Sequence, residues 1–80
     1  MMMISVERSI LIELIDSKLH IIREDMEKIL NTWGYQSVEK FLQDTRDGTL
    51  LEAEDDAVCL HGLIYDQEKM LQLKKTWVGQ

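Results

Sequence analysis

Residues 31–48, NTWGYQSVEKFLQDTRDG, interrupt two long helical patterns and so decide the fold. Gly34 stands where the first pattern stops, and glycine adopts the left-handed conformation that ends many helices at little cost. Ser37 is a favourable N-cap for a second helix, and Gly48 ends it. The stretch therefore predicts a corner, in which a helix stops and a short helix follows over about residues 38–47.

The segment before the corner predicts one long helix over about residues 5–33, with Ser5 as its N-cap. Its apolar residues recur every three, four or seven positions, which is the spacing of one helix face. Such a helix would be roughly 42 Å long at 1.5 Å per residue. The residues assigned to the face that pairs with a second copy or a partner are Leu11, Ile15, Leu19, Ile22 and Met26. Four more widen the stripe, namely Ile10, Leu14, Ile21 and Ile29.

The segment after the corner predicts a third helix over about residues 54–77. Acidic residues gather at its start, where the helix dipole favours negative charge. They define a candidate acidic patch: Glu52, Glu54, Asp55 and Asp56. Gly62 lies inside the helix at a cost of about 1 kcal/mol relative to alanine, which predicts a close helix crossing there.

The aromatic residues are predicted to anchor the corner and the helix ends. They are Trp33, Tyr35, Phe41 and Trp77. In the corner they are expected to plug the end of a helical bundle, and a partner-binding pocket is the alternative.

The fold class predicted from these patterns is all-α, because apolar residues alternate with period two over no useful length. We expect a single domain over residues 1–80, with two long helices in an antiparallel hairpin joined through the short middle helix. A chain this short buries only roughly 60% of its unfolded surface, so its core is marginal. The long first helix is apolar on more than one side, which predicts pairing into a dimeric helical bundle, a homodimer.

The net charge indicates which classes of partner the protein can bind. Nine lysines and arginines against fifteen aspartates and glutamates leave a net charge of −6. Such a surface repels nucleic acid and anionic lipid, so a basic protein is the expected partner, with no nucleic acid and no membrane. A lone cysteine, Cys59, favours a reducing compartment, and no segment has the pattern of a signal peptide or a membrane span. The expected location is cytoplasmic.

The side chains that could act as metal ligands, acids, bases or nucleophiles do not form a predicted catalytic, metal or cofactor site. His20 and Glu24 are four apart, but two ligands do not make a metal site. Cys59 and His61 are two apart, which directs them to different sides of a helix, and Cys59 is expected to be a small buried hydrophobe. The acidic patch lacks the spacing of a calcium loop. The sequence therefore predicts no enzyme, no metal and no cofactor.

The order of features resembles the small acidic antitoxin-like proteins of archaeal and bacterial toxin–antitoxin pairs. The likeness spans about half of the chain. The residues that carry it are Gly34, Tyr35, Ser37, Glu39, Phe41, Gly48 and the acids between Glu52 and Asp56. They match no family motif, so no functional residue is carried over. The chain lacks the separate DNA-binding element of many antitoxins, so operator binding lies outside what the resemblance implies.

The predicted function is therefore a protein–protein interaction module, antitoxin-like, that binds and masks a basic partner. The acidic surface would steer the partner and apolar helix faces would supply affinity. Two alternatives remain: a structural helical subunit or scaffold of a larger assembly, and an acidic regulator that mimics nucleic acid.

Overall fold

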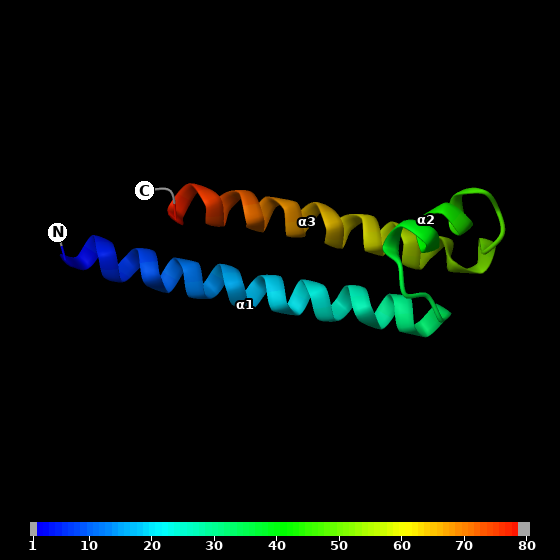
Figure 1. The fold of residues 1–80 in the computed structure, drawn as a ribbon, viewed down its shortest axis with the longest axis horizontal. Coiled ribbons are helices and arrows are strands. Elements are labelled where there is room, and N and C mark those ends of the chain that lie inside the picture. The colour runs from blue at the N-terminus through cyan, green and yellow to red at the C-terminus, as the bar shows by residue number, and fades with distance from the viewer. Residues whose placement is uncertain (1, 79–80) are drawn as a thin grey trace.

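The computed structural model describes the backbone of residues 2–78 and the side chains of residues 7–78. Within that range the chain forms α1 (Met2–Trp33), α2 (Val38–Arg46), the short 3-10 helix η1 (Leu51–Ala53) and α3 (Glu54–Val78). No strand occurs among these residues (Figure 1). The predicted all-α class with three helices is confirmed.

The helix boundaries differ slightly from the predicted ones. α1 begins at Met2, so Ser5 lies inside the helix and does not cap it. Methionine is a good helix former and isoleucine is tolerated inside a helix, so α1 extends past the possible serine cap. α2 ends at Arg46, one residue before the predicted end, and α3 continues to Val78.

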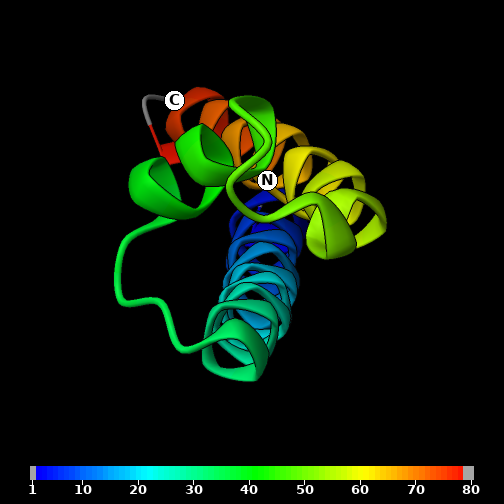
Figure 2. The same ribbon diagram turned by 90° about the vertical axis from the view of Figure 1, so that its right-hand side faces the viewer.

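The two long helices lie side by side along an elongated molecule of 56 × 18 × 17 Å (Figure 1). Toward one end, Lys74 Nζ of α3 lies 2.7 Å from Asp16 Oδ1 of α1. At the other end, Trp33 Nε1 donates a hydrogen bond of 2.8 Å to Asp56 Oδ2. α2 lies at this second end, beside the start of α3 (Figure 1). Seen end-on, α1, α2 and α3 occupy three different positions around the long axis (Figure 2).

The core has two parts. At the corner, buried residues from every element form one cluster, and they are Leu30, Phe41, Ala53, Ala57 and Leu60. Farther along α1, Ile15, Leu19 and Ile22 are at most 5% exposed. α3 runs beside this part of α1 (Figure 1). Because α2 lies at the other end, the packing of α3 on α1 accounts for the burial of these side chains.

This burial corrects the predicted pairing face. The sequence pattern assigns Ile15, Leu19 and Ile22 to a surface between copies or partners, but they fill the interface between α1 and α3 of a single chain. Leu11 and Met26 lie half-buried on the same side. The prediction treats the most regular apolar stripe as free, whereas α3 covers it.

The corner has the predicted local geometry. Gly34 has a φ of +73°, and its N–H donates to Asn31 O at 3.2 Å while Tyr35 N–H donates to Leu30 O at 2.8 Å. This pair of hydrogen bonds is the Schellman arrangement, which satisfies the last carbonyls of a helix. Ser37 Oγ accepts from Lys40 N–H at 3.2 Å and caps α2.

Gly62 does not mark a close helix crossing, so that prediction is wrong. The residue is exposed, and a Cβ added to it would meet nothing within 4 Å. Its face of α3 points away from α1, so glycine there contributes only backbone freedom.

The two glycines should therefore respond to alanine with opposite signs. Gly62→Ala is expected to raise the free energy of unfolding by about 0.5–1 kcal/mol, because alanine restricts the unfolded chain and fits the helix. Gly34→Ala is expected to lower it by about 1–2 kcal/mol, because a Cβ strains the left-handed conformation. Urea unfolding followed by circular dichroism measures both. Stabilisation by Gly34→Ala would contradict the geometry of the corner.

Candidate functional site

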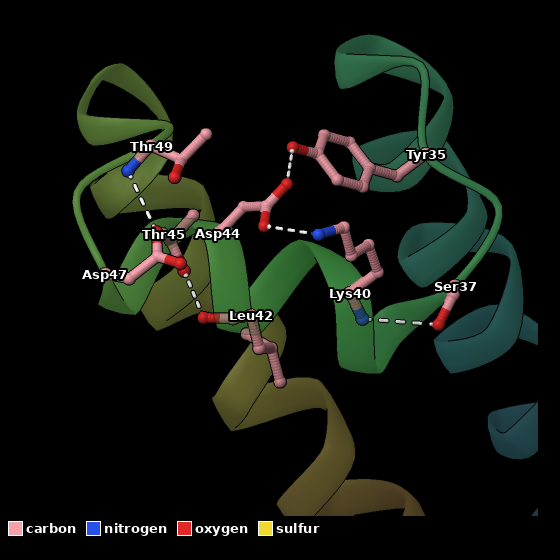
Figure 3. A network of polar contacts seen from close by, with 8 residues as sticks. All are labelled: Tyr35, Ser37, Lys40, Leu42, Asp44, Thr45, Asp47 and Thr49. Carbon is pink, nitrogen blue, oxygen red and sulfur yellow. Dashed lines mark hydrogen bonds and ion pairs between the residues drawn. The ribbon is translucent and has the colours of Figure 1, made fainter.

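The corner is held by a polar network around Asp44, which is 7% exposed. Tyr35 Oη donates a hydrogen bond of 2.6 Å to Asp44 Oδ2, and Lys40 Nζ lies 3.0 Å from Asp44 Oδ1 (Figure 3). Lys40 and Asp44 are one turn apart on α2, whereas Tyr35 comes from the loop that follows α1. The network therefore fastens this loop to α2.

The charges of the network are fixed by its hydrogen bonds. The hydrogen bond from Tyr35, and then the one from Lys40, hold the pKa of Asp44 below its ordinary value. Donation to that carboxylate raises the pKa of Tyr35. Hydrogen bonds from Thr49 likewise lower the pKa of Asp47 (Figure 3). Both Asp44 oxygens already have partners, so this carboxylate stabilises the corner and is not poised to exchange protons at neutral pH.

Three of the four predicted anchors meet at the corner. Phe41 is fully buried, and the Tyr35 ring stands edge-on to it at 5.3 Å between centroids. Trp33 is half-buried against the same cluster and is oriented by its hydrogen bond to Asp56. Trp77 is half-buried near the end of α3, far from the other three. The aromatic residues of the corner thus close the end of the helix pair.

The predicted acidic patch is exposed at three of its four positions. Glu52, Glu54 and Asp55 are exposed, but Asp56 is half-buried and accepts the hydrogen bond from Trp33. Asp56 therefore serves the corner, and its place in the patch is corrected. Sequence reasoning missed this because Trp33 lies 23 residues away.

The patch belongs to a larger acidic end, defined as residues 31–60. This segment carries seven carboxylates and two cationic side chains, whereas the other fifty residues carry eight carboxylates and seven cationic side chains. Five of the six net negative charges therefore lie in the segment that forms one end of the elongated molecule (Figure 1).

A second surface feature is an apolar strip on α1. Ile10, Leu14 and Ile21 are 50%, 60% and 51% exposed. At about 100° per residue they share one face of the helix, about 120° from the face that packs on α3. The sequence signal for this strip is the widened apolar stripe, but the prediction places the partner face on the other side. Ile29, the fourth residue of that widened stripe, is half-buried against the corner cluster.

An open, mostly apolar groove of about 260 Å³ lies between α1, the start of α2 and α3. Its lining consists of Arg23, Met26, Glu27, Leu30, Val38 and Gln67. Three of the six, Met26, Leu30 and Val38, belong to the corner core or pack against it. The other three lining residues are polar, but the groove is open to solvent and does not enclose a small molecule as a typical ligand pocket does.

The side chains that could act as metal ligands or nucleophiles lie apart from one another on the surface. His20 Nε2 is 3.1 Å from Glu24 Oε1, and both side chains are more than half exposed. Cys59 is exposed, so the prediction that it is buried is wrong. Ala57 and Leu60 occupy the inner side of α3 there, which leaves Val58 and Cys59 outside. Within residues 2–78, no three His, Cys, Asp or Glu side chains are grouped to hold a metal ion.

In the described part of the chain, none of the helices has the length and apolar character required to cross a bilayer.

Comparisons with known proteins find no match, whether to family models, to curated proteins or to solved structures.

Proposed function

We propose that this protein is an interaction module, antitoxin-like, that binds and masks a basic protein partner. The observation that carries the proposal is the concentration of net negative charge at the acidic end. A surface of one sign attracts a partner of the other sign over about a Debye length, roughly 8–10 Å in ordinary salt. Within the acidic end, the exposed carboxylates of Glu52, Glu54 and Asp55 are the charges that face a partner most directly.

The proposed architecture is an antiparallel hairpin of α1 and α3 that pairs with a second copy into a helical bundle. The contacts of Asp16 with Lys74 and of Trp33 with Asp56 support the hairpin. The half-exposed apolar residues of α1 support the pairing. In this arrangement the corner is a rigid platform that presents the acidic end to a partner.

The test begins with the partner that co-purifies with the tagged protein from native cells. Its association rate is measured by stopped flow from low to high salt. The variant Glu52→Gln/Glu54→Gln/Asp55→Asn removes three exposed charges from the acidic end and leaves Asp56 to hold Trp33. We expect association about tenfold slower at low salt and a flatter salt dependence, because steering depends on the summed field.

The matched control removes the same types of charge elsewhere. Glu13→Gln/Asp66→Asn/Glu68→Gln replaces three exposed acids outside the acidic end. It should slow association much less. Equal effects of the two triple variants would mean that only net charge matters. An unchanged rate in the first variant would contradict steering by the acidic end, and a helical subunit of a larger assembly would then be the better interpretation.

A further inference from the structure

The apolar strip on α1 has the spacing of a helix-pairing seam. With Ser17 included, its positions are 10, 14, 17 and 21, so the steps are four, three and four. Alternating steps of three and four keep residues on the side of a helix that faces a partner helix. Ser17 is exposed like its apolar neighbours, and none of the described elements covers this side.

The surface of the whole chain is larger than a compact monomer needs. The radius of gyration is 16.3 Å. A compact domain of this length would have a radius of gyration of about 12 Å. The accessible surface is 6121 Å², whereas a typical monomer of this mass exposes about 5,000 Å². The surplus of about 1,100 Å² exceeds the roughly 800 Å² that each partner contributes to a standard interface.

From these observations we infer that the strip binds the same strip of a second copy, with the two α1 helices antiparallel. The inference rests on the proposed pairing of two copies and names the surface that performs it. The spacing of the strip reads identically in both directions. An antiparallel pair therefore places Ile10 opposite Ile21 of the second copy and Leu14 opposite Ser17 of the second copy.

The charge distribution selects this orientation. A parallel pair would bring the two acidic ends within the roughly 8–10 Å that separates packed helices, which is inside one Debye length at ordinary salt. The centre of the strip lies about 15 residues before the acidic end. Antiparallel pairing therefore holds the two acidic ends about 45 Å apart, at about 1.5 Å per residue. It also leaves both acidic ends open to partners.

The experiment compares dimer dissociation constants by sedimentation velocity from low to high micromolar concentration. The wild-type chain should sediment at about twice 9.4 kDa. Leu14→Glu should weaken the dimer at least about 100-fold, because the carboxylate would lose its water without gaining a partner. Ser17→Leu should strengthen it about tenfold, because the leucine would fill the layer against Leu14.

The control is Val58→Glu, which adds the same charge at an apolar residue of α3 that is 68% exposed. It should change the dissociation constant less than about threefold. Leu14 is 60% exposed in the single chain, so Leu14→Glu should keep its helical circular dichroism. A folded Leu14→Glu variant that dimerises like the wild type would overturn the strip as the interface, while leaving pairing of two copies intact.

Orientation is tested with Ile10→Cys and Ile21→Cys, each made with Cys59→Ser, and a short bis-maleimide. An equimolar mixture should crosslink between copies much more than either variant alone. Efficient crosslinking of each variant with itself would overturn the antiparallel arrangement. A monomeric wild type at all concentrations would overturn both the strip and the pairing, and the salt-dependent binding of the basic partner would still be tested separately.

Discussion

Phe41→Ala is expected to remove much of the stability of the chain. The ring is fully buried in the corner cluster, where it packs beside Leu30 of α1 and Leu60 of α3. Truncating a buried phenylalanine costs about 3–5 kcal/mol, through lost burial and the cavity that remains. Small domains have only about 5–15 kcal/mol in total. Urea unfolding at a fixed protein concentration measures the loss.

Tyr65→Ala is the matched control, because it removes a similar ring that is 60% exposed on α3. The Lys69 ammonium lies 5.5 Å from the centre of this ring. With that cation–π contact included, the expected cost is at most about 1 kcal/mol. Comparable losses in the two variants would show that α2 is not held by the buried ring of Phe41.

Ile22→Asp is expected to abolish the folded state at every protein concentration. Ile22 is 1% exposed between α1 and α3. The variant would therefore bury an unpaired carboxylate at a cost of several kcal/mol. Helical circular dichroism should collapse. The adjacent Ile21→Asp should remain helical, because Ile21 is 51% exposed.

This pair of neighbours tests the corrected pairing face directly. If Ile22 lay between copies, Ile22→Asp would give a folded monomer at low concentration. Such a monomer would contradict the packing of α1 on α3.

The sequence predicted the helices and the corner because their signals are local. A glycine that ends α1 and a serine that caps α2 act within one turn of the backbone. Their hydrogen bonds join residues three to five positions apart. Such interactions depend little on the rest of the fold.

The assignment of surfaces could not be predicted in the same way. α1 carries two apolar sides, and periodicity alone does not say which one α3 covers. The partners of Asp44 and Asp56 could not be predicted either, because each carboxylate accepts a hydrogen bond from an aromatic residue beyond the reach of one helical turn, 9 and 23 positions away. Position along a helix likewise did not determine that Cys59 lies outside.

The corner also determines the order in which the contacts between α1 and α3 form during folding. Joining Trp33 to Asp56 closes a loop of 23 residues, whereas joining Asp16 to Lys74 first would close one of 58. The longer loop costs about 0.8 kcal/mol more in chain entropy. We therefore expect folding to start at the corner, with α1 and α3 then pairing progressively toward the Met2 end of α1. Opening should follow the reverse path, so the far end can separate while the corner, with its acidic end, stays assembled.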